Sequence, residues 1–472
     1  MRFSIILPCL FLLGSATAQQ QWTLEQCLER AEQQNLVFRN VQLETELARK
    51  VSKQSRWALL PDLNAGATHG YNWGKAVDRY TNTFATDRVR TNNLWLSSNW
   101  ILFQGLRLQN ERIKADLDTD ASSKGLEAQR NSIRRDVVSA YLDVLSLREG
   151  INAAKAQASS TQGQVDVIKA FVDAGRVARS QLLDLDAQLA REELTVVQIE
   201  NQYTQTLLQF GQLLFLSPEE QRTFDIVAPA IAAISITEPT RTVEEIMPAV
   251  LASDPAYSRA LLNVESAEKA EAIAKSGGIP SVSFNASVST GYSGLNQVAV
   301  GEPILQDPIP IGATQGGELV YAPNYNYNTE VTDFGTQLDD NLNESVGFTL
   351  SVPIFNNMRN RLAVDQAYVL KEQREILRGI EQQRVQRDIQ EALNQQRSAY
   401  REFHSASRAL EASTEALRYA QERFTAGAIT SVELNTAKNN VARTTVDVIT
   451  ARYSWVKAAK SLEILQGLPV SL

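Results

Sequence analysis

Histidine and cysteine, the side chains that most often bind transition metals or act as nucleophiles, are nearly absent from this chain. The two histidines, His69 and His404, lie far apart in the sequence, and neither has a cysteine beside it. This spacing argues against a histidine-based metal site. No phosphate-binding P-loop, glycine-rich dinucleotide turn or Gly-x-Ser-x-Gly elbow occurs. We therefore expect a protein that is not an enzyme and uses no cofactor.

Charge and cysteine content narrow the class further. The net charge is −8, whereas nucleic-acid binding requires a basic surface, so we expect no nucleic-acid partner. Cys27 is the one cysteine after residue 18, which excludes an internal disulfide in the rest of the chain. It shares a helical apolar stripe with Leu24 and Leu28, a pattern typical of a small core residue.

Residues 1–18 have the pattern of a cleaved signal peptide. Arg2 supplies the positive charge, Phe3 to Leu13 the apolar stretch, and Ala16-Thr17-Ala18 the small-residue cleavage site. A transmembrane anchor is the alternative, but this apolar stretch is too short to cross a bilayer. No later segment offers an apolar run of about 18 residues, so any further membrane crossing must use β-strands.

Similar motifs recur in the same order in the two halves of the chain. Pro61 and Pro280 are 219 residues apart in matching contexts, and Phe103 and Phe355 are 252 apart. The repeat predicts two copies of one unit: a helix, two strands, a very long helix and a second helix. Because the offsets differ by 33 residues, the second copy must carry an insertion between its strands.

This pattern divides the chain into consecutive segments. They are a signal peptide (1–18), a first repeat (19–228), a linker (229–241) and a second repeat (242–472). Each repeat should begin with one helix, from Thr23 to Ala58 and from Thr242 to Lys275, because each threonine is a good N-cap.

Four segments of about ten residues alternate between apolar and small polar side chains. In the third, Val282 and Phe284 alternate with Ser283 and Asn285, which predicts strands with one apolar face. A soluble β-sandwich gives the same alternation, but ten residues is also the length that crosses a bilayer, and the chain is expected to be exported. The four strands are expected at about 62–71, 93–102, 281–291 and 345–354.

Four strands cannot close a barrel, and an open strand edge in lipid costs several kcal/mol for each unpaired backbone group. The barrel must therefore be shared between copies of the chain, and three copies give twelve strands. The segment from about Ser293 to Leu342, rich in Gly, Asn, Pro and Tyr, is expected to be a long loop on the outer side of such a barrel.

Two stretches without proline, Leu106 to Val172 and Met358 to Phe424, predict helices roughly 100 Å long. Helices of this length require neighbouring helices along their sides, which indicates a coiled-coil arrangement. A shorter helix should follow each of them, over about 177–216 and 429–465.

In this order and spacing, the motifs resemble those of the TolC-like outer membrane efflux proteins, over nearly the whole chain after residue 18. The resemblance rests on the doubled architecture and on four short motifs; Ile101 departs from it by replacing the proline that Pro353 represents. The motifs are Trp22-Thr23-Leu24-Glu25-Gln26-Cys27, Val352-Pro353-Ile354-Phe355, the turns Asp173-Ala174-Gly175 and Thr425-Ala426-Gly427, and Gln181-Leu182-Leu183-Asp184-Leu185-Asp186-Ala187-Gln188.

The resemblance implies a homotrimer with a twelve-stranded β-barrel in the outer membrane of a Gram-negative cell and a twelve-helix α-barrel in the periplasm. Such a protein is a passive exit duct of a tripartite efflux or type I secretion system. Its expected partners are outer membrane lipid, a periplasmic adaptor and an inner-membrane pump.

The resemblance also singles out the turns between paired helices as tips that dock the adaptor. They are Gly175-Arg176-Val177-Ala178 and Gly427-Ala428-Ile429-Thr430. A purely structural role is the alternative, because glycine supplies the backbone freedom that ends a helix.

A ring of carboxylates narrows the closed pore in this family, and the matching position here is Glu433. Ile429 replaces an expected basic residue and Gln181 an expected acid, so the usual salt bridge between hairpins is not expected. Thr436 likewise stands where a second acid is expected. Asp184 and Asp186 are candidate substitutes, with a solvated helix face as the alternative explanation.

Two other functions are alternatives to the duct. A soluble periplasmic coiled-coil adaptor or scaffold would share the signal and the long helices, but it would carry one hairpin rather than two matched copies. An adhesin built around residues 293–342 would leave both hairpins without a role.

Overall fold

The structure, a computed structural model, describes residues 20–85, 88–229, 231 and 234–469; the expected signal peptide lies outside this range. Two compact units are formed, each from both halves of the sequence. The first comprises the described residues up to Arg49, Asp116–Ser266 and Glu372 onward, and the second comprises Lys50–Ala115 and Ala267–Lys371. The boundary falls within four long helices, so the contacts of each unit are described separately.

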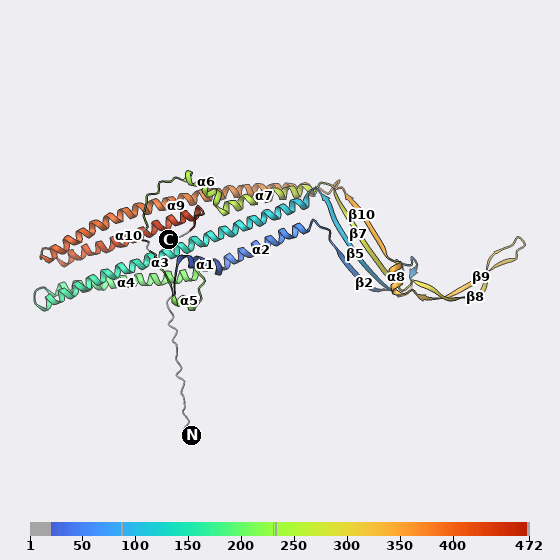
Figure 1. The fold of residues 1–472 in the computed structure, drawn as a ribbon, viewed down its shortest axis with the longest axis horizontal. Helices are drawn as coiled ribbons and strands as arrows, with labels where there is room; N and C mark the ends of the chain where they lie inside the picture. Colours follow the sequence, from blue (N-terminus) through green and yellow to red (C-terminus); the bar gives the residue numbers. More distant parts are fainter. Residues whose placement is uncertain (1–19, 86–87, 230, 232–233, 470–472) are drawn as a thin grey trace, which may run out of the picture. The chain divides into compact units, whose positions relative to one another are not determined.

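Helices dominate the chain, which confirms the mainly helical prediction (Figure 1). The two longest helices, one in each half of the chain, both have 67 residues, and the helix that follows each of them has 35 residues. The helices are α1 (Leu24–Gln34), α2 (Leu36–Trp57), α3 (Arg107–Asp173), α4 (Arg179–Leu213), α5 (Pro218–Thr223), α6 (Val243–Ser253), α7 (Pro255–Ser276), α8 (Phe334–Asp340), α9 (Arg359–Thr425) and α10 (Ser431–Leu465).

The helix predicted at the start of each repeat is in fact two helices, broken at Asn35 and at Asp254. These residues are 219 apart, the offset already seen between Pro61 and Pro280. Each leaves the helical conformation, and its side chain caps the next helix: Asn35 Oδ1 accepts from Phe38 N (2.9 Å) and Asp254 Oδ1 from Tyr257 N (2.7 Å). The single-helix prediction was wrong because a short polar side chain satisfies the donors of a new helix start.

The main core of the first unit surrounds the middle of α3. Tyr141 and Leu145 pack there with Cys27 and Phe210. Strands β1 (Gln20–Trp22) and β6 (Phe224–Ile226) pair in parallel beside them. The Tyr141 hydroxyl donates to the backbone oxygen of Val227 (2.6 Å), so its buried oxygen is satisfied. Burial raises the pKa of the Cys27 thiol to about 12, as expected for a core cysteine that does no chemistry.

The second unit contains a four-stranded antiparallel sheet in the order β10-β7-β5-β2. Its register places Phe348, Phe284 and Trp100 side by side on one face, and Gly347, Asn285 and Asn99 on the other. The predicted alternation is therefore in phase across neighbouring strands. The strands are β2 (Asn64–Asn72), β5 (Val89–Gln104), β7 (Ser281–Ser293) and β10 (Asn343–Ser351).

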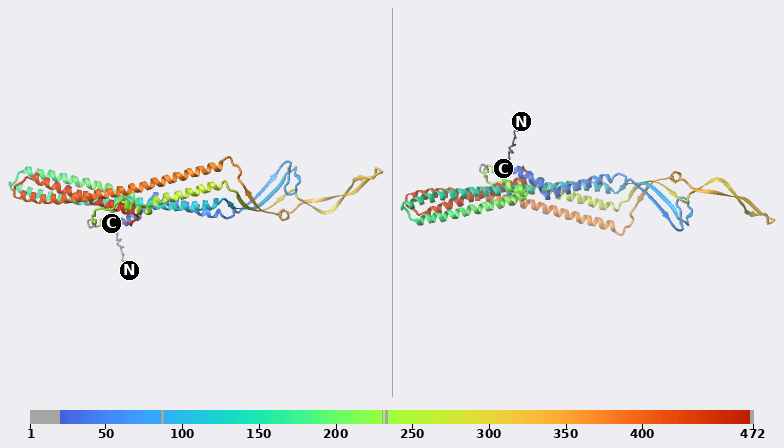
Figure 2. Two further views of the ribbon diagram at one scale, coloured as in Figure 1. Left: turned by 90° about the horizontal axis from the view of Figure 1, so that it is seen from above. Right: turned by 90° about the horizontal axis from the view of Figure 1, so that it is seen from below.

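Most of the segment expected to be a long loop is a β-hairpin, formed by β8 (Gln297–Ala313) and β9 (Leu319–Val331) and followed by α8. Figure 2 shows this two-stranded ribbon. The prolines of β8 suggested a loop, but proline is tolerated in an edge strand and at bulges. The pairing register shifts where these prolines occur, between 300 and 304, 306 and 309, and 310 and 312. The short strands β3 (Ala76–Val77) and β4 (Phe84–Ala85) form a separate pair.

The helix breaks lead to a test of stability. We expect Asn35→Ala to lower the free energy of unfolding by about 1 kcal/mol, the usual value of an N-cap. Asp254→Ala should cost about 2 kcal/mol or more, because Asp254 also accepts from Arg384 at 3.2 Å and is a buried partner of that cation.

Thermal and denaturant unfolding of the purified protein measure both changes. The control is Asn40→Ala on the exposed face of α2, where the Asn40 side chain donates to Glu44 of the same helix, and a change within about 0.5 kcal/mol is expected. Equal losses for all three variants would contradict the capping role.

Candidate functional site at the hairpin tips

The two hairpins end in the same backbone turn. After α3, Gly175 has φ +70°, and after α9, Gly427 has φ +74°. In the first, Gly175 N donates to Val172 O (2.9 Å) and Arg176 N to Phe171 O (2.8 Å). This is a Schellman motif, in which a left-handed residue closes the helix end. The second turn repeats it, with Gly427 N bonded to Phe424 O and Ala428 N to Arg423 O.

The helices that leave the turns begin differently. Ala178, before α4, supplies no side-chain cap. Thr430, before α10, forms a capping box with Glu433: Glu433 N donates to Thr430 Oγ1 (3.3 Å) and Thr430 N to Glu433 Oε2 (2.9 Å). A reciprocal pair of this kind satisfies two otherwise unpaired donors. Glu433, predicted from the family as a pore carboxylate, therefore also holds the second tip.

An apolar cluster lies directly behind the tips. Val165, Ile168 and Leu185 are buried there, and Val177 and Phe424 pack against them. Phe424 comes from the end of α9, so the cluster joins the two hairpins. The remaining tip residues are mostly exposed, and the Arg176 guanidinium lies over the Phe171 ring at 4.9 Å.

The structure places the two predicted constriction residues near the starts of α4 and α10. Both Asp184 and Glu433 are exposed. Within the described residues, no hydrogen bond or ion pair joins them, so one copy of the chain does not bring them together. A ring of such carboxylates would have to come from several copies.

Sequence reasoning missed a set of polar residues between the hairpins, which we call the polar seam: Ser160 of α3, Gln188 and Glu192 of α4, and Lys438 and Asn439 of α10. Lys438 is 2% exposed, and Glu192 is 9% exposed. Burial lowers the pKa of the Lys438 ammonium, while the field of Glu192 opposes that shift. One feature of the sequence could have revealed this burial. Lys438 lies on the same face of α10 as Ser431 and Leu434, which are both buried.

Beside the polar seam, α3, α4 and α10 line a groove of about 550 Å³. Most of its lining is small or apolar, including Ala153, Ile199 and Val446. Within the described part of the chain, no group of three or more His, Cys, Asp or Glu residues is placed to hold a metal ion. No described helix has the length and hydropathy needed to cross a membrane.

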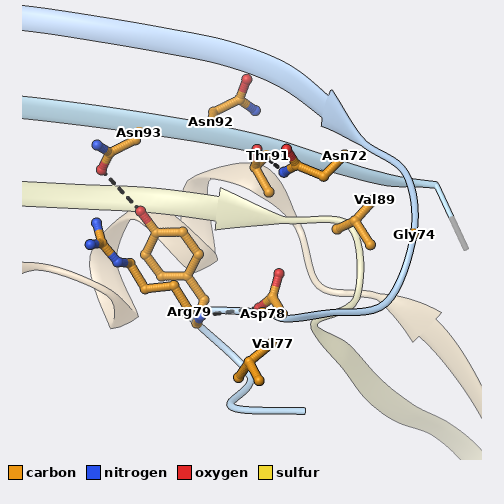
Figure 3. A pocket seen from close by; sticks show the side chains of 10 residues that line it. Asn72, Gly74, Val77, Asp78, Arg79, Val89, Thr91, Asn92 and Asn93 are labelled. Carbon is orange, nitrogen blue, oxygen red and sulfur yellow. Dashed lines mark hydrogen bonds between the residues drawn. The ribbon is translucent and has the colours of Figure 1, made fainter. Parts of the chain in front are cut away.

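A second, smaller pocket of about 230 Å³ lies beside Asp78 in the second unit (Figure 3). Asp78 is buried, and its Oδ1 accepts from the backbone nitrogens of Tyr80 (3.0 Å) and Thr81 (2.9 Å). Its Oδ2 accepts from Ser293 Oγ at 2.6 Å. Both carboxylate oxygens are thus used to fasten the segment between β2 and β5 to the end of β7, which marks Asp78 as structural.

Comparison with known proteins identifies the family. The family model described as outer membrane efflux protein matches residues 27–214 and 246–468, most of the chain. The chain belongs to the outer membrane efflux protein family.

Curated relatives of this family protein include the outer membrane protein TolC of Escherichia coli K12, 25% identical over 174 residues. TolC of Salmonella enteritidis is 26% identical over 171 residues. Each match covers 35% of this chain and 35% of the relative, so the aligned part spans about a third of the curated proteins.

Solved structures share the fold over nearly the whole length. CusC superposes with a TM-score of 0.74 at 15% identity, over 94% of this chain and 92% of the other. VceC of Vibrio cholerae gives 0.72 at 15% identity, over 94% and 96%. A membrane protein of Pseudomonas aeruginosa gives 0.73 at 18% identity, over 94% and 92%. The family resemblance expected from the sequence is confirmed.

The tip geometry generates a second test. We expect Gly427→Ala to destabilise the tip by about 1–2 kcal/mol, because an L-residue is strained at positive φ. Gly427→Asn should cost less, since asparagine tolerates this conformation. No atom lies within 4 Å of an added Cβ, so strain rather than collision decides the result.

Hydrogen exchange of the Gly427 and Ala428 amides, which close the turn, measures the loss locally. Faster exchange in the asparagine variant than in the alanine variant would contradict the backbone explanation.

Proposed function

We propose that this efflux-family protein is one subunit of a homotrimeric, passive exit duct in the outer membrane. The observation that carries the proposal is the sheet β10-β7-β5-β2, which combines an apolar face with two unpaired edges. On β10, Phe348 is 73% and Val346 75% exposed, although both belong to the apolar face. An exposed apolar face of this kind suits contact with lipid.

The two edges supply the argument for several copies. Among the described residues of one chain, β2 and β10 each pair on one side only. Unpaired backbone groups in hydrocarbon cost several kcal/mol each, so lipid-facing strands occur only in closed barrels. Three copies would pair β10 of each with β2 of the next and close twelve strands. This number is even, as is usual for bacterial outer membrane barrels.

The helices support a second, periplasmic part of the duct. At about 1.5 Å per residue, α3 and α9 are each roughly 100 Å long. Within the first unit, α4 returns beside α3 and α10 returns beside α9 (Figure 1). In three copies these helices would form a twelve-helix α-barrel. The proposed duct supplies no energy, and an inner-membrane pump drives transport through it.

The hairpin tips are the proposed docking point for a periplasmic adaptor. Gly175-Arg176-Val177-Ala178 and Gly427-Ala428-Ile429-Thr430 are mostly exposed, and a glycine turn allows another backbone to come close. Efflux assays on the two Gly427 variants separate docking from folding. If only the fold of the turn matters, Gly427→Asn restores efflux; if close approach matters, both variants lose it.

Glu433 is the proposed constriction residue, and Asp184 is its candidate counterpart on the first hairpin. Three Glu433 carboxylates around one axis would attract cations and repel anions. The capping box holds each carboxylate at the start of α10, which fixes its position at the tip.

The membrane-facing role of the sheet can be tested with two neighbouring positions on β10. We expect Phe348→Lys to prevent stable assembly, because a lysine on the lipid face costs about 2–4 kcal/mol near the bilayer centre. Gly347→Lys is the matched control: it faces the other side, and no atom lies within 4 Å of the added Cβ.

Heat-modified electrophoresis of outer membrane fractions reads the result. A heat-sensitive trimer is expected for the parent and Gly347→Lys and not for Phe348→Lys. If the protein instead remained a monomer in water without detergent, the duct would be refuted in favour of a periplasmic scaffold.

The constriction can be tested by charge alone. We expect Glu433→Gln to reduce the cation preference of channels in planar bilayers, because three negative charges are removed from the narrowest point. Glutamine can keep the capping box, so the tip should retain its stability. Glu193→Gln, which removes an exposed acid farther along α4, is the control. Unchanged selectivity in Glu433→Gln would remove Glu433 from the constriction.

A further inference from the structure

Two charged side chains of opposite sign are buried between the hairpins of the first unit. Lys438 of α10 is 2% exposed, and Glu192 of α4 is 9% exposed. Charged side chains are almost never buried to this degree unless they are compensated. Lys438 lies about two turns from the start of α10 and Glu192 about three and a half turns from the start of α4. Both are in the contact that must part if the second hairpin is to move away from the first.

Neither charge is fully satisfied by direct partners. Lys438 Nζ donates to Ser160 Oγ at 3.3 Å and, within the described chain, forms no direct ion pair. Glu192 Oε1 accepts from Gln157 Nε2 (3.0 Å) and from Gln188 Nε2 (2.8 Å). Glu192 Oε2 is buried and makes no hydrogen bond with the residues described.

A short chain of amides connects Glu192 to α10. Gln188 Nε2 donates both to Glu192 Oε1 and to Asn439 Oδ1, the latter at 2.7 Å. Asn439 is next to Lys438 in the sequence. On α3, Gln157, which donates to Glu192, and Ser160, which accepts from Lys438, are three residues apart. The carboxylate and the ammonium therefore lie along the same turn of that helix, where the field of Glu192 favours the charged lysine.

We propose that Lys438 and Glu192 are positioning residues that hold α10 against the α3–α4 hairpin by compensating each other's buried charge. The proposal rests on the proposed function in one respect: parting of the hairpins would widen the aperture between the tips. The coupling between the two residues follows from their burial and exists whether or not the protein conducts.

Buried charge pairs have a recognisable energetic pattern. Loss of one partner strongly destabilises a contact, because the other charge is left buried without compensation. Removal of both is often neutral or even stabilising. Two residues that serve only as packing would instead give losses that add. A double-mutant cycle therefore separates charge compensation from packing.

Ser431→Cys provides a reporter of the contact. Ser431 is 5% exposed and lies on the same face of α10 as Lys438, so the introduced thiol is protected while the hairpins stay together. Cys27 remains in the protein without interfering, because its thiol is buried and its pKa is raised to about 12. The rate of maleimide labelling is measured on the detergent-purified full-length protein.

We expect Lys438→Met and Glu192→Gln each to raise the labelling rate at least about tenfold over the parent. The double variant should label more slowly than either single variant and within about threefold of the parent. A double variant that labels as fast as or faster than the faster single variant overturns the proposal, and so does a lack of effect in both single variants.

Lys457→Met is the matched control. Lys457 also joins α10 to α3, through an ion pair with Asp143 at 2.7 Å, but both side chains are more than a third exposed. Exposed ion pairs contribute little, so a change below about twofold is expected. If Lys438→Met does not assemble, Lys438→Gln, which can still bond Ser160, replaces it.

Single-channel conductance of the same variants then tests the link to transport. Larger or longer openings in both single variants, with recovery in the double, support the role in the aperture. If the labelling rates change as the double-mutant cycle predicts but the conductance does not change, only the role in the aperture is overturned. A protein that forms no channel refutes the proposed function and leaves the labelling result intact.

Discussion

The constraint on which the rest depends is the pairing of the strand edges β2 and β10. Each has one hydrogen-bonded neighbouring strand in the part of the chain that the structure describes, and in hydrocarbon the other side has no water to bond. This requirement favours a closed ring of copies, and a ring in turn places the long helices side by side. The apolar face formed by Phe348, Phe284 and Trp100 is then an asset for a membrane protein, whereas it would be an aggregation hazard on a soluble one.

The two halves share a backbone plan but differ in side chains at functionally relevant places. Asn35 and Asp254 break corresponding helices, and Gly175 and Gly427 close corresponding hairpins with positive φ. At the next step the halves diverge, because Ala178 does not cap its helix and Thr430 does so with Glu433. Ile429 and Gln181 stand where the residues of the family's salt bridge are expected, and the buried Lys438 and Glu192 lie in the contact between the hairpins. The two halves therefore share their helix breaks and hairpin turns, but they differ in the side chains that stabilise the tips.

Much of the fold was predictable because it follows from the hydrophobic periodicity of the sequence and from the positions of its proline and glycine residues. The absence of proline predicted the long helices α3 and α9, and the Ala-Gly turns at Gly175 and Gly427 placed their ends to within a residue. The period-two pattern located the four strands of the sheet to within a few residues. The break at Asn35 was not predicted, since a capping side chain can interrupt a helix without any change in hydrophobic pattern. The break at Asp254 did have a sequence signal that was overlooked, because Pro255 is the first residue of α7 and proline favours that position. The β8–β9 hairpin was missed because Pro303, Pro308 and Pro310 look like loop residues until they are placed on an edge strand.

For the site, the tip glycines were evident from the sequence, but the capping role of Glu433 and the polar seam were not. Burial of Lys438 depends on α3 and α4, which are far away in the sequence, and only the fold brings them together.

Hydrogen exchange of the edge strands in the lipid-embedded protein tests the central claim most directly. The amides of β2 and β10 should be protected as strongly as those of the inner strands β5 and β7, because every edge would be paired with the next copy. Rapid exchange of the outward-facing amides of β2 or β10, beside protected inner strands, would show open edges and contradict the account.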